Sequence, residues 1–126
     1  MEEYIAFNKA LKFFIRCTIE SFPHMKELKM LLVTYKTLKT ISKKKPCKIF
    51  LQILNEDFHK AIMEKDESFF FTHEVECQDI IGYLKNAVHR EWSAMSEEDK
   101  DKIWQHLQVL LLLSKKAEKM QSATSI

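Results

Sequence analysis

Glycine occurs once in this chain of 126 residues, at Gly82, and proline only twice, at Pro23 and Pro46. Sheets need frequent turns, and turns depend on Gly, Pro and Asn to reach backbone angles that other residues avoid. A chain with so few of these residues is expected to have long regular elements and few turns between them. The scarcity therefore predicts an all-α fold, a single-domain bundle of about five helices over residues 1–120. Residues 121–126 are expected to form a frayed tail.

Apolar residues that recur every three or four positions indicate where these helices lie. The periodic segments cover approximately residues 3–20, 24–42, 46–62, 79–94 and 97–120. The third helix is expected to divide at residues 55–57, and 65–78 are interpreted as a loop with a short helical turn capped by Asp66. Ser96 and Asp99 resemble a capping box at the start of the last helix. Seven side chains are expected to be buried: Leu28, Leu32, Phe50, Leu84, Trp104, Leu107 and Leu111.

The net charge of +2 hides an uneven distribution of charge. Residues 1–63 carry 12 basic and 6 acidic side chains, a balance of +6, whereas residues 64–126 carry 8 basic and 12 acidic ones, a balance of −4. Between Glu27 and Glu56 there are seven lysines and no acid. We call these residues the lysine ridge: Lys29, Lys36, Lys39, Lys43, Lys44, Lys45 and Lys48. Such a ridge binds phosphate backbones without sequence preference, docks an acidic protein, or is simply a solvated helix flank.

Near its end the chain carries the segment QHLQVLLLLSKK, with five consecutive apolar residues at 109–113. A membrane-spanning helix needs about 20 apolar residues, so we expect no membrane span. If residues 97–120 form a helix, their apolar side chains fall on two faces of it. The first face, expected to be buried, consists of Ile103, Leu107, Leu110, Leu111 and Ala117. The second face lies nearly opposite and consists of Val109, Leu113 and Met120; Leu112 lies between the two faces and is counted with the second as interface.

A helix that is apolar on two sides is either central in its own bundle or shared with another chain. We favour the central position and keep the second face as the candidate protein interface. Within that face, we expect Val109 to be buried and Leu113 to contact a partner. The partner is expected to be another protein or a second copy of this chain.

Motifs of the common catalytic sites are missing from the sequence. It has no Gly-x-Ser-x-Gly, no glycine-rich phosphate loop and no His-Glu-x-x-His. His73 and Cys77 have the spacing of metal ligands but lack the further ligands that structural zinc requires. The aromatic residues 69–71, Trp92 and Trp104 could stack on bases, but their phase favours packing in the core. We therefore expect no catalytic residue, metal or cofactor, and identify no small-molecule substrate.

The cysteine usage favours a reducing environment. Cys17, Cys47 and Cys77 are an odd number of widely spaced thiols, and the first residues lack the basic region of a secretory signal. Disulfides are rare in reducing compartments, so all three thiols are expected to be free. We therefore expect an intracellular location.

Four segments of the chain resemble small all-helical proteins of nucleocytoplasmic large DNA viruses that infect algae and protists. These segments are FPHMKELK, KKKPCKIF, MEKDESFF and REWSAMSEEDKDKIWQHLQVLLLLSKK. The resemblance runs from Phe7 to Lys116 and implies a viral protein in the host cytoplasm, viral factory or virion, without assigning site residues. Our interpretation is a non-enzymatic helical protein-interaction module that acts in assembly or in the virion. The alternative is a sequence-neutral nucleic-acid-associated protein that uses the lysine ridge.

Overall fold

The computed structural model describes residues 2–72 and 80–124, and in this part of the chain seven helices and no strand are present. The side chains of residues 53, 80–84, 87 and 122–124 lie outside the description. The helices are α1 (Glu2–Ser21), α2 (Lys26–Ile41), α3 (Lys45–Ile53), α4 (Glu56–Glu64), α5 (Glu67–Thr72), α6 (Ile80–Trp92) and α7 (Glu97–Thr124). The predicted all-α class is confirmed. The two additional helices come from the divided third segment and from the short turn after residue 65.

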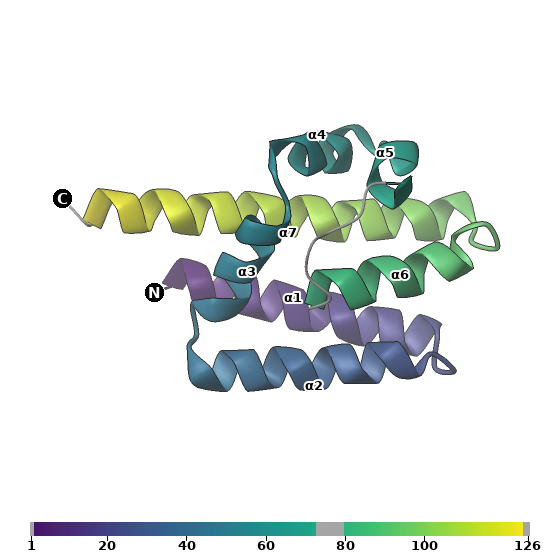
Figure 1. Cartoon of the computed structure of the whole chain (residues 1–126), viewed down its shortest axis with the longest axis horizontal. Coiled ribbons are helices and arrows are strands. Elements are labelled where there is room, and N and C mark those ends of the chain that lie inside the picture. Colours follow the sequence, from purple (N-terminus) through teal and green to yellow (C-terminus); the bar gives the residue numbers. More distant parts are fainter. Residues whose placement is uncertain (1, 73–79, 125–126) are drawn as a thin grey trace.

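Four long helices run along the molecule, each antiparallel to the next (Figure 1). α1 packs between α7 and α2, and α2 also packs against α6. Trp92 of α6 meets Trp104 of α7 with ring centroids 5.6 Å apart, which closes the group into a bundle. α3 lies against α1, α2 and α7, while α4 packs on α7 and α5 packs on α4. Both termini lie at one end, where the Tyr4 hydroxyl donates a hydrogen bond to Gln121 Oε1.

Three polar side chains begin helices at the positions indicated by the sequence. Asn55 Oδ1 accepts a hydrogen bond from the amide three residues on, at 3.1 Å, and this cap separates α4 from α3. Asp66 Oδ1 and Ser96 Oγ accept equivalent bonds, each at 3.1 Å, at the starts of α5 and α7. Each cap satisfies an amide that has no partner within its helix, which stabilises a helix by about 1 kcal/mol. α7 continues to Thr124, beyond the predicted end at Met120.

The core follows most of the predicted positions. Five of the seven side chains expected to be buried are buried: Leu28, Phe50, Trp104, Leu107 and Leu111. Leu32 is only partly buried, because it lies at the edge of the core rather than inside it. The side chain of Leu84 lies outside the described residues. Each of the seven helices contributes at least one buried aromatic side chain to this core, and these large side chains help a chain of this size to exclude water from its centre.

The predicted inward face of α7 is buried except for Ile103, which is partly buried. α7 packs on α1, α3 and α4, but these helices do not cover its second face, as the expected central position would require. The second face is therefore open: Val109, Leu112 and Met120 are exposed. Although α7 has 28 residues, neither it nor any other described helix has the continuous apolar length needed to cross a bilayer.

The expected roles of Val109 and Leu113 are reversed in the structure. Leu113 is partly buried against the core, whereas Val109 is exposed. The reason is the position of α1, which was not predictable from α7 alone. His106 stacks on Phe14 of α1, and Leu113 lies two helical turns after His106 on the same side of α7. Val109 lies farther round the helix, beyond the reach of α1.

Candidate functional site

The lysine ridge of α2 lies beside a second row of basic residues on α1. Two hydrogen bonds fix the register of these antiparallel helices. The Tyr35 hydroxyl donates to Asn8 O at 3.0 Å, and Asn8 Nδ2 donates to Lys43 O at 2.8 Å. This register places the outer flank of α1 next to the ridge. We call the combined surface the basic face, and it consists of Lys9, Lys12, Arg16, Lys29, Lys36, Lys39 and Lys43.

Lys12 lies where the two rows of positive charge meet. The pKa of Lys12 is lowered from its ordinary value, and the largest cause is Arg16, one turn along α1. Desolvation comes next, followed by the like charges of Lys39 and Lys36 on α2. Like charges lower a lysine pKa only when they are close enough to repel its ammonium group. Lys12, Arg16, Lys36 and Lys39 therefore join the two rows at one point of concentrated positive charge.

No carboxylate interrupts the basic face. Residues 4–19 and 28–55 contain neither Asp nor Glu. Glu27, just before the second stretch, pairs with Arg90 of α6 at 3.0 Å, on the flank of α2 that faces α6. Within residues 2–72 and 80–124, none of the seven basic side chains takes part in an ion pair. The face consequently carries uncompensated charge, which a polyanion would neutralise.

The structure divides the predicted ridge at the turn between α2 and α3. The Nζ atom of Lys44 lies 5.5 Å from the centroid of the Tyr4 ring, and this side chain is half-buried. Lys45 and Lys48 are exposed but belong to α3. The prediction from the sequence missed the contribution of α1: Lys9, Lys12 and Arg16. The signal that could have revealed it is the absence of acids over residues 4–19, which parallels their absence around the ridge.

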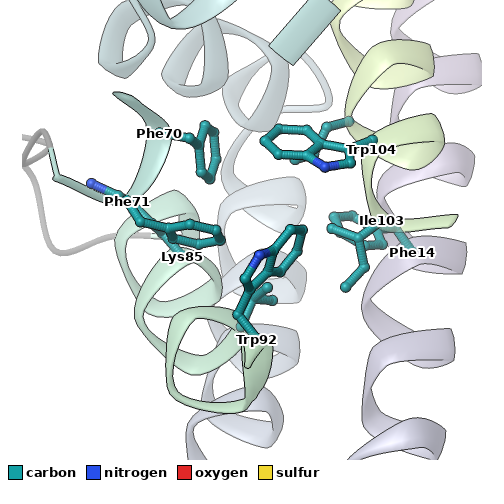
Figure 2. A pocket seen from close by; sticks show the side chains of 9 residues that line it. Phe14, Phe70, Phe71, Lys85, Trp92, Ile103 and Trp104 are labelled. Carbon is teal, nitrogen blue, oxygen red and sulfur yellow. The ribbon is translucent and has the colours of Figure 1, made fainter. Parts of the chain in front are cut away.

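The aromatic residues form core rather than a stacking platform. Figure 2 shows Phe70, Phe71, Trp92 and Trp104 directed toward one another around a small cavity. Its volume of about 20 Å³ leaves room for about one water molecule. Trp92 Nε1 donates a hydrogen bond to Glu67 at 2.8 Å, which satisfies the buried indole. Phe70, Trp92 and Trp104 are buried and Phe71 is partly buried, so the cluster serves packing rather than the stacking of nucleic-acid bases.

A buried lysine also lines this cavity. Lys85 is 7% exposed, and its Nζ atom lies 5.6 Å from the centroid of the Phe58 ring. That distance permits a cation–π interaction, which partly offsets the loss of hydration of a buried ammonium group. Lys85 of α6 thus contacts a ring of α4, and the cavity beside it is too small for a substrate.

Burial shields one of the two described thiols from reaction. Cys17 and Cys47 are free, and Cys77 lies outside the described residues. Burial is the main reason why the pKa of Cys47 is raised to about 12, with the charge of Glu118 adding to it. A thiol with this pKa is protonated at neutral pH and is a poor nucleophile or metal ligand. The described residues contain no group of three His, Cys, Asp or Glu side chains that could hold a metal ion, and residues 73 and 77 lie outside them.

Comparison with known proteins gives no match. The chain matches no protein-family model, no curated protein and no solved structure. A function for this chain must therefore be argued from its own surface. Its most distinctive surface is the basic face, because two helices contribute charge to it and no acid compensates that charge.

Proposed function

We propose that the protein binds the phosphate backbone of nucleic acid, without sequence preference, through the basic face. The observation that carries the proposal is the accumulation of positive charge around Lys12 in a region without carboxylates. Bringing these cations together on folding is unfavourable unless a polyanion shares the surface. Lysines that contact phosphates release condensed counterions, and this release drives sequence-neutral binding.

The composition of the basic face favours nucleic acid over an acidic protein. Tight protein interfaces usually centre on buried aromatic or arginine anchors. The basic face instead presents lysines on flexible stems together with one arginine, Arg16. A lysine ammonium is a compact charge that meets phosphate oxygens in many geometries, and it does not distinguish one base from another. This chemistry supports backbone contact rather than reading of sequence.

The test compares two double variants with the same change in net charge. Lys12→Gln/Lys36→Gln removes two charges from the basic face. The matched control, Lys60→Gln/Lys115→Gln, removes two exposed charges from α4 and α7 that form no ion pair within the described residues. Binding to labelled DNA duplexes and single-stranded RNA of unrelated sequences is followed by fluorescence anisotropy between about 50 and 200 mM salt.

We expect the wild type to bind all these nucleic acids with similar affinity. The plot of log K against log salt should become shallower in the basic-face variant by about 1.8 for duplex DNA and about 1.4 for single-stranded RNA, because each lost phosphate contact removes about 0.9 or 0.7, respectively. The control should retain the slope of the wild type. The proposal fails if the wild type does not bind at low salt, or if both variants lose the same slope. Binding to polyglutamate but not to nucleic acid would favour an acidic protein as the partner.

A second function, protein interaction through α7, is supported by a separate observation. Val109, Leu112 and Met120 leave an apolar strip exposed on a helix whose other side is buried. Apolar strips of this kind are often used for association. Changing Val109 and Leu112 to Ser should abolish self-association or partner capture while the melting temperature stays unchanged. Sedimentation and thermal unfolding measure the two effects, and an unchanged assembly would remove this function.

The setting of both functions is also proposed. The viral, virion-associated role rests on the resemblance of four sequence segments, and a protein with a basic face and an apolar strip would suit the assembly of nucleic acid with protein. Detection of the protein in purified particles, together with nucleic acid, would support this setting. Its exclusion from such particles would limit the proposal to the binding activity itself.

A further inference from the structure

A groove separates the C-terminal half of α1 from the start of α7. Its volume is about 740 Å³, which falls within the range of roughly 300–1,000 Å³ that is typical of ligand sites. The turn between α6 and α7 also lines it. The apolar lining comes from these three segments and from the residue after α1: Phe13, Phe14, Phe22, Met95 and Ile103.

An exposed phenylalanine forms one wall of this groove. The ring centroid of Phe13 lies 5.7 Å from that of His106, which itself stacks on Phe14 at 4.8 Å. Phe13 nevertheless remains 61% exposed. Removing exposed apolar surface from water is favourable, so a partner that covers this ring gains from the contact. Phe13 therefore marks the groove as a surface for docking rather than an incidental gap.

The charged groups at the groove are mainly acidic. Glu20 and Asp99 line it, and neither forms an ion pair with the described part of the chain. Glu91 also lines it, with its Oε1 atom 3.1 Å from His24 Nε2. The single lysine at the groove, Lys102, is already paired with Glu98 at 3.5 Å. The groove thus combines an apolar lining with a negative rim.

We propose that this groove docks an amphipathic helix of a partner protein whose apolar residues are flanked by lysine or arginine. The walls are two antiparallel helices, and a third helix can lay apolar residues at i, i+3 and i+4 spacing between them. Basic flanks would meet Glu20 and Asp99, whereas acidic flanks would be repelled. The site is distinct from the basic face, which carries the opposite charge, so the partner differs from the nucleic acid proposed above.

The test uses two synthetic amphipathic peptides, each about four helical turns long, with identical apolar residues. One peptide carries lysine flanks and the other carries glutamate flanks. Binding is measured by fluorescence anisotropy on the Lys12→Gln/Lys36→Gln protein, so that the basic face does not capture the acidic peptide. Amide chemical shifts then locate the bound peptide on the protein.

Three single variants identify the groove as the site. Phe13→Ser removes the exposed wall, Glu20→Gln removes one charge from the rim, and Val33→Ser is the control. Val33 is 63% exposed but lies on α2, away from the groove. Because all three side chains are exposed, the variants should keep the fold, which circular dichroism verifies.

We expect the lysine-flanked peptide to bind about 10-fold more tightly than the glutamate-flanked one. Phe13→Ser should weaken binding by about 10-fold or more, as is typical of an aromatic anchor. Glu20→Gln should weaken it less, and Val33→Ser should leave it unchanged. Equal affinity for both peptides, indifference to Phe13→Ser, or no binding at all would overturn the proposal. A dimer that Phe13→Ser converts to a monomer would also overturn it, since the occupant would then be a second copy.

Discussion

Leu111 and Leu112 are neighbours in α7, yet replacing each with alanine should affect the free energy of unfolding very differently. Leu111 is 1% exposed and belongs to the core, whereas Leu112 is 58% exposed. Leu→Ala at a buried site removes favourable burial and leaves a cavity, at a cost of about 2–5 kcal/mol. At Leu112 most of the side chain is already in water, so the change should stay within about 0.5 kcal/mol.

These energies correspond to clearly separable melting temperatures. For a domain of this size, 1 kcal/mol shifts the melting temperature by about 4 °C. Leu111→Ala should therefore lower it by roughly 8–20 °C, and Leu112→Ala by no more than about 2 °C. Urea and thermal unfolding, followed by circular dichroism and tryptophan fluorescence, measure both quantities. The two variants have the same composition and nearly the same helix propensity, so each is the control for the other.

The protein concentration separates folding from association. Measured at low concentration, the difference between Leu111→Ala and Leu112→Ala reports the burial within one chain. If Leu112→Ala becomes destabilising only as the concentration rises, Leu112 lies in an interface between copies. Equal destabilisation of both variants at every concentration would refute the reasoning, because α7 would then be covered on both sides.

Three further predictions concern titratable groups. Burial lowers the pKa of His106, so the unfolded state binds the proton more readily than the folded state. The free energy of unfolding should therefore fall as the pH drops below about 6.5, and urea titrations should show a smaller fall in the His106→Gln variant. Binding of DNA should raise the lowered pKa of Lys12, which NMR of its side chain can follow, whereas an unchanged pKa would place the phosphates elsewhere. Cys47 should react with thiol reagents much more slowly than the half-exposed Cys17, as mass mapping of the native protein would reveal; equal rates would contradict its burial.

Features that depend on local interactions could be predicted from the sequence. The caps formed by Asn55, Asp66 and Ser96 each involve an amide only three residues away, so the sequence around them contains both partners. The buried face of α7 followed from the helical period alone. The side of α7 that stays open could not be predicted in this way. Val109 is exposed and Leu113 is partly buried, and this difference depends on where the other helices pack, which is a property of the whole fold.

The candidate site shows the same division between local and distant information. The lysines of α2 are close in the sequence and predicted a basic ridge. The contribution of α1 depends on its register with α2, which the bond between Asn8 and Lys43 fixes across 35 positions of the chain. Periodicity within one helix cannot supply that register. The groove beside Phe13 was likewise not predictable, since its walls come from segments at opposite ends of the sequence.

The crowding of charge around Lys12 gives the folded protein an unusual response to ions. Added salt screens the mutual repulsion of Lys12, Arg16 and Lys39, so it should stabilise the folded state. The same salt competes with phosphates and weakens nucleic-acid binding. High salt therefore stabilises the folded state of the free protein and at the same time releases its ligand. A bound polyanion would act as the counterion that the isolated chain lacks.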